Sequence, residues 1–179
     1  MVEALLELYA EGNLDPTTDE VAQRSGLSAR SLFRYFEDVD DLCQAAITHH
    51  LASIGALSAL PPPREEPLED RVRTVAQMRV RLHHAIGAVG RVARVKAPFI
   101  PVLGNMLSDR RRDVRVFLGA WFAPELARMA PDVAATSLAA IDVVCSFEGM
   151  DLLAADYGMD PDAIQAVVER AITTILAGA

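Results

Sequence analysis

The stretch that decides the fold runs from Thr17 to Leu42 and reads TTDEVAQRSGLSARSLFRYFEDVDDL. Thr17 can cap the start of a helix, and Glu20, three residues later, supplies the second half of a capping box. Gly26 allows the sharp turn that ends this helix, because glycine readily adopts left-handed backbone conformations. The sequence therefore predicts a short capped helix over about residues 18–25.

A second short helix follows the turn, over about residues 29–36. Ser28 can cap it, and its apolar side is formed by residues at positions i, i+1 and i+4, namely Leu32, Phe33 and Phe36. The residues expected to face outward are small or polar: Ala29, Arg30, Ser31, Arg34 and Tyr35. Two short helices joined by a glycine turn are typical of the helix-turn-helix, which places its second helix in the DNA major groove.

This segment resembles the DNA-binding head of the tetracycline-repressor-like (TetR) transcriptional regulators. The matching features are Thr17, Glu20, the pair Val21-Ala22, the turn Gly26-Leu27-Ser28 and the aromatic helix Ser31-Leu32-Phe33-Arg34-Tyr35-Phe36. The resemblance is close over roughly the first quarter of the chain, and beyond it length and helical organisation agree. It implies a DNA-binding head followed by a helical regulatory domain.

The outward side of the second helix carries the residues that we expect to contact DNA. Arginine is the best bidentate partner for guanine edges, so Arg30 and Arg34 should face the groove or its phosphates. Small and hydroxyl-bearing neighbours would allow close approach and bind phosphates. The expected DNA-binding set is Thr17, Ser28, Ala29, Arg30, Ser31, Arg34 and Tyr35. The alternative is a solvated surface helix that happens to carry two arginines.

The charge of the head opposes DNA binding. The chain has a formal net charge of -8. Residues 1–50 contain three arginines, whereas their acidic residues are Glu3, Glu7, Glu11, Asp15, Asp19, Glu20, Glu37, Asp38, Asp40 and Asp41. Phosphate binding favours a positive surface. We expect Glu20 and Asp38 or Asp40 to be used at helix N-termini, where negative charge is stabilising. In the resembled family a basic arm often precedes the first helix, and its absence here would explain part of the deficit.

The helical periodicity of apolar residues, and the glycines and prolines at the ends of the periodic segments, predict an all-α fold of nine or ten helices in two unequal groups. Pro61 to Pro67 form a stiff polar connector after the fourth helix. We assign residues 1–45 to the helix-turn-helix DNA-binding domain and residues 46–179 to a helical regulatory, ligand-binding and dimerisation domain. The expected helices cover about 2–11, 18–25, 29–36, 39–57 (which connects the two domains), 68–95, 101–107, 109–129 (broken near Pro124), 131–157 and 160–176.

The second domain contains bulky apolar residues that would line a ligand cavity, namely Phe99, Met106, Phe117, Trp121, Phe122, Phe147 and Met150. Polar residues nearby would orient the ligand. We single out as ligand-binding candidates His83, Met106, Phe117, Trp121, Phe147, Glu148 and Asp151. Taken singly, each is more simply a core residue, and Glu148 or Asp151 is more simply part of a structural ion pair with Arg79, Arg81, Arg91 or Arg94.

The last two predicted helices carry more apolar surface than one core requires. One stripe contains Val133, Leu138, Ile141, Val144 and Cys145, and the other contains Ile164, Val167, Val168, Ile172, Ile175 and Leu176. Alanines at 134, 135, 139 and 140 permit close helix approach. A helix pair of this kind suits a four-helix interface between two copies, which is its role in the resembled family.

The two cysteines, the adjacent histidine pairs and a run of three arginines are expected to have core or surface roles rather than binding roles. Cys43 and Cys145 stand alone and are expected to be buried reduced thiols. The adjacent pairs His49-His50 and His83-His84 point about 100° apart on a helix, so surface positions are expected rather than a metal site. Arg110-Arg111-Arg112 is flanked by aspartates, which favours a solvated loop or helix start.

No apolar run of membrane-spanning length and no secretion signal is apparent, so we expect a cytoplasmic location.

Three functions are compatible with these observations. The first is a homodimeric repressor that is released from its DNA operator by a small apolar or amphipathic ligand, without any cofactor. The second is a helical binding or scaffold protein with a degenerate head, favoured by the acidic charge and by Val39 where the family often has lysine. An enzyme is the third, but no nucleophile, phosphate-loop or metal motif of useful specificity is present. We expect a regulator rather than an enzyme.

Overall fold

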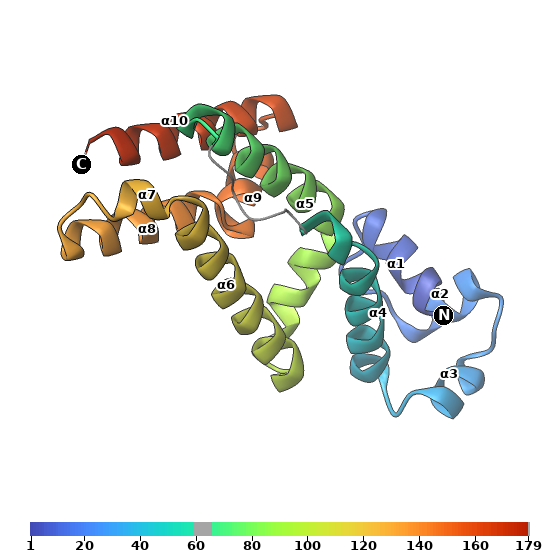
Figure 1. The fold of residues 1–179 in the computed structure, drawn as a ribbon. Coiled ribbons are helices and arrows are strands. Elements are labelled where there is room, and N and C mark those ends of the chain that lie inside the picture. Colours follow the sequence, from blue (N-terminus) through green and yellow to red (C-terminus); the bar gives the residue numbers. More distant parts are fainter. Residues whose placement is uncertain (59–65, 179) are drawn as a thin grey trace. The chain divides into compact units, whose positions relative to one another are not determined.

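The computed structural model describes residues 1–58 and 66–178, and in these residues it is helical without strands (Figure 1). This confirms the predicted all-α class with nine or ten helices. The elements are α1 (Val2–Ala10), α2 (Thr18–Ser25), α3 (Ala29–Tyr35), α4 (Val39–Ser53), the 3-10 turn η1 (Gly55–Ser58), α5 (Leu68–Lys96), α6 (Pro101–Trp121), α7 (Ala123–Leu126), α8 (Pro131–Val144), α9 (Phe147–Ala155) and α10 (Pro161–Ala177). Most of the expected proline-rich connector lies outside the described residues.

The chain forms two compact units. The first comprises Met1–Ala56 and Ile86–Ser108, and the second comprises Leu57–Ala85 and Asp109–Ala179. Helices α5 and α6 therefore each belong partly to one unit and partly to the other. The functional division near residue 45 stays a prediction, because compactness does not report which residues bind DNA.

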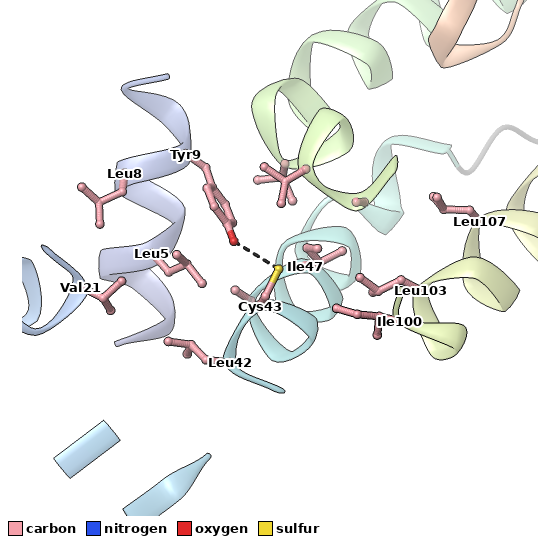
Figure 2. Close-up of a cluster of buried hydrophobic side chains, with 14 of the residues drawn as sticks. Leu5, Leu8, Tyr9, Val21, Leu42, Cys43, Ile47, Ile100, Leu103 and Leu107 are labelled. Atoms are coloured by element: carbon pink, nitrogen blue, oxygen red, sulfur yellow. Dashed lines mark hydrogen bonds between the residues drawn. The ribbon is translucent and has the colours of Figure 1, made fainter. Parts of the chain in front are cut away.

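An apolar cluster holds the first unit together (Figure 2). Its labelled members come from α1, α2, α4, the residue before α6 and the first two turns of α6: Leu5, Leu8, Tyr9, Val21, Leu42, Cys43, Ile47, Ile100, Leu103 and Leu107. The Tyr9 hydroxyl donates to Cys43 Sγ at 3.2 Å between α1 and α4. Burial raises the pKa of both groups, and their hydrogen bond raises the pKa of Tyr9 further. Cys43 is thus a buried free thiol, as predicted.

The second unit has its own apolar cluster. Its fully buried members include Val75, Leu118, Phe122, Ile141, Cys145, Met150, Val168 and Ile172. Arg71 lies beside this cluster and donates from Nη1 to Glu125 Oε2 at 3.0 Å and to the Trp121 carbonyl. Burial alone would raise the pKa of Glu125, but the hydrogen bonds and charge of Arg71 lower it below its usual range. Burial raises the pKa of Cys145 to about 12, so this free thiol stays protonated.

Helix α6 differs from the sequence prediction. We expected one helix to end near Leu107 and another to start near Asp109, but α6 is continuous from Pro101 to Trp121. The residues around the expected break are compatible with a helix, and the Ser108 hydroxyl donates back to the Gly104 carbonyl at 2.9 Å. The break predicted at Pro124 is confirmed, because α6 ends before it and α7 begins at Ala123.

The helix expected over 131–157 is broken into α8 and α9. Helix α8 ends at Val144, and Ser146 caps α9 by accepting a hydrogen bond from the Gly149 amide at 2.9 Å. A Cβ atom at Gly149 would lie 2.6 Å from the Val143 carbonyl oxygen, which no real side chain tolerates. The tight turn between the helices therefore requires glycine at position 149.

Helix α5 has the predicted extent but contains an unpredicted kink at Gly87. Its backbone there has φ 48° and ψ -138°, a conformation that residues with a Cβ atom rarely adopt. A Cβ atom at this position would meet no atom within 4 Å, so backbone conformation rather than space requires the glycine. The kink lies at the junction between the two units, which falls between Ala85 and Ile86.

We expect Gly87→Ala to lower the free energy of unfolding by about 1–3 kcal/mol, because alanine would be strained in this conformation. Gly119→Ala is the matched control. Gly119 lies inside α6, and its Cβ would make an ordinary 3.6 Å contact with Leu138 of α8. Alanine also favours helix over glycine by up to about 1 kcal/mol. Urea denaturation followed by circular dichroism measures both. Equal stability of the two variants would contradict a strained position 87.

Candidate nucleic-acid interface and effector site

The predicted capping box of α2 is confirmed. Thr17 Oγ1 accepts from the Glu20 amide at 3.3 Å, and Glu20 Oε2 accepts from the Thr17 amide at 2.7 Å. Hydrogen bonds from the Thr17 side chain and backbone lower the pKa of Glu20. Gly26 ends the helix with φ 69°, as the turn required. These local contacts fix the start and end of α2 without any need for distant residues.

The seven-residue helix α3 is held from one side. Ser28 Oγ accepts from the Ser31 amide at 3.2 Å, and Leu32 is completely buried in the first unit. Successive helical residues are rotated by about 100°, so Arg30 and Arg34 lie on the side opposite Leu32. Both arginines are exposed, as are Tyr35 and Phe33. The helix thus presents its two cations to the surroundings.

Arg34 is oriented by its neighbour. Its Nη2 donates to the Tyr35 hydroxyl at 2.7 Å, and its guanidinium carbon lies 4.6 Å from the centroid of the Tyr35 ring. Arg30 has no ion-pair partner within residues 1–58 and 66–178. One arginine is therefore restrained, and the other is available to adapt its position.

Other cations near the head are already paired. Arg24 binds Glu11 at 2.7 Å and Glu7 at 3.5 Å. From the end of α5, Lys96 lies 3.3 Å from Asp15 and 3.6 Å from Asp40. Burial would lower the pKa of Lys96, but its hydrogen bond and ion pairs raise it overall. The pairing of Lys96 was missed from the sequence, because residues 81 positions apart give no local signal.

The acidic residues of the head are partly used as expected. Asp38 Oδ1 accepts from the Asp41 amide at 2.8 Å and so caps α4, while Glu20 belongs to the box of α2. These carboxylates stabilise helix starts, where negative charge is favourable. Capping does not remove these negative charges, which would oppose the approach of a phosphate.

One apolar expectation for the head is wrong, and a second apolar residue, Leu27, is 47% exposed because it lies in the turn before α3. Phe33 was placed on the buried side of α3, but 57% of it is exposed. A helix of two turns has room for one fully inward residue, which is Leu32, and Phe36 just beyond it is partly buried.

The ligand-binding candidates of the second unit meet around His83. This residue was expected at the surface but is buried, whereas its neighbour His84 is exposed. The His83 ring lies 4.8 Å from the Phe147 ring, centroid to centroid, and its Nε2 lies 3.5 Å from Asp151 Oδ1. The sequence did not predict this difference in burial. Adjacent residues of a helix point about 100° apart, so His83 lies on the buried side of α5 and His84 on its exposed side.

The remaining candidates are dispersed. The Phe117 and Trp121 rings lie 5.6 Å apart in the second unit. Glu148 is exposed and binds Arg111 at 2.7 Å, an arginine that the sequence placed in a solvated stretch. Met106 packs against the apolar cluster of the first unit, and Phe99 is 77% exposed. The His83, Phe147 and Asp151 group is therefore the part that the structure assembles.

Two further classes of site receive no support from the described part of the chain. Its histidines, cysteines and carboxylates form no group of three that could hold a metal ion. Among the helices described, none is sufficiently long and apolar to cross a membrane.

A capped helix, a glycine turn and a second helix that presents arginines define a DNA-binding transcriptional regulator of the helix-turn-helix class. Residues 2–46 match the model of the family described as "Bacterial regulatory proteins, tetR family". Residues 2–46 therefore form a DNA-binding head of TetR type, in agreement with the resemblance noted from the sequence.

Known proteins resemble the chain well beyond the head. The HTH-type transcriptional regulator BetI of Paraburkholderia phymatum is 28% identical over 155 residues, which span 79% of this chain and 74% of that protein. A transcriptional regulator from Rhodococcus sp. Rha1 superposes with a TM-score of 0.76 at 20% identity, over 99% of this chain and 95% of its own. A TetR-like regulator from Rhodococcus sp. RHA1 gives 0.71 at 16% identity, over 99% and 94%. These two structures share the fold.

Proposed function

We propose that this protein is a cytoplasmic repressor that binds a DNA operator as a homodimer and leaves it when a small apolar or amphipathic molecule binds. The observation that carries the proposal is the position of Arg30 and Arg34, which lie on the exposed side of a capped recognition helix. Thr17, Ser28, Ala29, Ser31 and Tyr35 complete the proposed DNA-binding set.

The proposed docking places α3 in the major groove. Arg30 and Arg34 would reach guanine edges or phosphates, and the hydroxyls of Ser31 and Tyr35 would bind phosphate oxygens. Because Arg24 and Lys96 are already engaged with carboxylates, few cations remain to attract DNA. Affinity should therefore depend on salt less steeply than for a head with many free lysines and arginines.

Arg30→Ala and Arg34→Ala should each weaken operator binding about 30-fold or more, because a dimer loses two contacts of at least ~1 kcal/mol each. Fluorescence anisotropy with duplexes from the DNA flanking the gene provides the measurement. If all four arginines of the dimer neutralise phosphates, log K against log salt has a slope of about -3.6, and contacts to guanine edges instead make the slope shallower. Arg110→Ala, at an exposed arginine of α6, is the matched control.

Failure of the parent protein to bind any flanking duplex at low salt would contradict the proposal. So would full affinity in both α3 variants. Either result would favour a helical binding protein whose acidic head no longer binds DNA. Loss of affinity in Arg110→Ala as well would mean that arginine charge, rather than its position on α3, determines binding.

The proposed dimer forms through α8 and α10, which pack on one another and each keep an outward face of small residues. On α8 this face contains Val133, Ala135, Ala139, Ala140 and Val143 beside the exposed Asp132, and on α10 it contains Ala166, Thr173, Thr174 and Ala177 around the exposed Arg170. Ile141 and Ile172 point into the unit's own core and are completely buried. Small outward residues let helices of two copies approach closely, as a four-helix interface requires.

Val143→Glu should convert the dimer to a monomer, because the side chain is 67% exposed in one chain and a carboxylate would be buried by the partner. Sedimentation velocity at micromolar concentration measures the change. Val95→Glu is the control, since Val95 is 62% exposed on α5 in the first unit. A parent protein that sediments as a monomer would refute the dimer, and an unaffected dimer in Val143→Glu would refute this interface.

The proposed effector site surrounds His83 in the second unit. The Phe147 ring centroid lies 4.8 Å from that of His83, and Asp151 Oδ1 lies 3.5 Å from His83 Nε2. The further proposed ligand-binding residues are Phe117, Trp121 and Glu148. A buried imidazole and a partly exposed carboxylate could orient the polar end of a ligand among aromatic rings. The ligand would release DNA only by binding better to a conformation with lower DNA affinity.

N-phenyl-1-naphthylamine, a fluorescent apolar amine, can probe this site. We expect saturable binding that also lowers DNA affinity, and about fivefold weaker probe binding in His83→Leu because one polar contact is lost. His84→Leu makes the same change at the exposed neighbouring position and should bind normally. Non-saturable binding, or equal affinity in both variants, would contradict the site. Saturable binding without any effect on DNA would contradict the release.

A further inference from the structure

Helix α3 has an apolar flank beside its arginines. Ala29 and Phe33 are separated by one helical turn, so they lie on the same side of α3, between the buried Leu32 and the outward Arg30 and Arg34. Phe33 is 57% exposed although it is large and apolar. A partner that covers the ring would bury its apolar surface, which is favourable in water.

The opposite flank of α3 has different chemistry. Ser31 and Tyr35 are likewise one turn apart and carry hydroxyls, and the Tyr35 hydroxyl already accepts from Arg34. A polar flank of this kind suits phosphate oxygens. The flank of Ala29 and Phe33 has no side-chain donor or acceptor, so neither phosphates nor the polar edges of bases are suitable partners for it.

We propose that Phe33, with Ala29, is a specificity-determining residue that packs against thymine 5-methyl groups in the major groove. This inference rests on the proposed function, in which α3 enters that groove. Thymine is the base that presents a methyl group there, and apolar side chains recognise it by contact. The flank is continuous with the arginine face of the same helix, so DNA that reaches Arg30 and Arg34 also comes close to Phe33.

The charge of the head makes such a contact important. With acidic residues around α3 and two outward arginines on it, electrostatic attraction that ignores sequence is limited. Apolar contact with methyl groups adds affinity that does not depend on salt and differs between bases. The recognised half-site should therefore combine guanine, read by arginine, with thymine next to it.

The test begins with the full-length protein and a library of duplexes whose central positions are randomised. We expect each half-site of the enriched duplexes to contain a fixed thymine beside a guanine. Replacing that thymine by deoxyuridine removes the methyl group and leaves base pairing intact. Binding should weaken about fourfold for each half-site, the effect of one buried methyl group.

The same thymine-to-uracil change should have no effect on Phe33→Ala, which already lacks the aromatic contact. Phe99→Ala is the matched control, because Phe99 is an exposed aromatic residue of the first unit outside α3, and this variant should keep the fourfold loss. Since the base change leaves the protein unaltered, its result does not depend on how stable Phe33→Ala is.

The possible failures are distinguishable. Enrichment of no duplex would overturn both the proposed function and this inference. Specific enrichment without a fixed thymine, or with uracil tolerated equally by the parent protein, would overturn the inference and leave DNA binding intact. Equal uracil sensitivity in the parent protein and Phe33→Ala would show that another residue contacts the methyl group.

Discussion

The orientation of the recognition helix depends on one buried side chain. Leu32 is the member of α3 that is completely buried, and a seven-residue helix has little stability of its own. Its cap at Ser28 fixes where the helix starts, and Leu32 fixes which side faces the first unit. The directions of Arg30, Arg34 and Phe33 follow from these two constraints. A change that moved Leu32 out of the cluster would therefore alter every proposed DNA contact at once.

Electrostatics in the head stabilises its structure more than it attracts DNA. Glu20 and Asp38 cap helices, Arg24 joins α2 to α1, and Lys96 joins the end of α5 to the start of α4. The pairing of Arg24 and Lys96 uses cations that could otherwise attract phosphates. The arrangement favours recognition by shape and by base-specific contacts over general attraction to nucleic acid.

Sequence reasoning predicted the features that local chemistry controls. The capping box at Thr17, the turn at Gly26 and the break near Pro124 each depend on residues within one helical turn, and all three are present. The start of α9 also had a local signal in Ser146, but the surrounding apolar periodicity masked it. In contrast, the pairing of Lys96, the burial of His83 and the exposure of Phe33 depend on tertiary packing, which a single sequence does not display.

The kink at Gly87 shows why the remaining features could not be predicted. Glycine inside a helical pattern is tolerated at a cost of about 1 kcal/mol, so the sequence alone does not distinguish a straight helix from a kinked one. The backbone at Gly87 is one that glycine readily adopts, and it lies where α5 leaves one compact unit for the other. Helix α6 also belongs to both units but is continuous across its junction.

Helices that belong to both units connect the proposed effector site in the second unit to the head. These helices are α5 and α6, and they differ mechanically. A continuous helix such as α6 resists bending because its backbone hydrogen bonds would have to lengthen. The backbone at the Gly87 kink of α5 is already non-helical, so this helix bends more easily there. Since His83 lies on α5 four residues before Gly87, a ligand at His83 would be bound close to the more deformable connection. Differential affinity between two arrangements of this connection is the physical requirement for release of DNA.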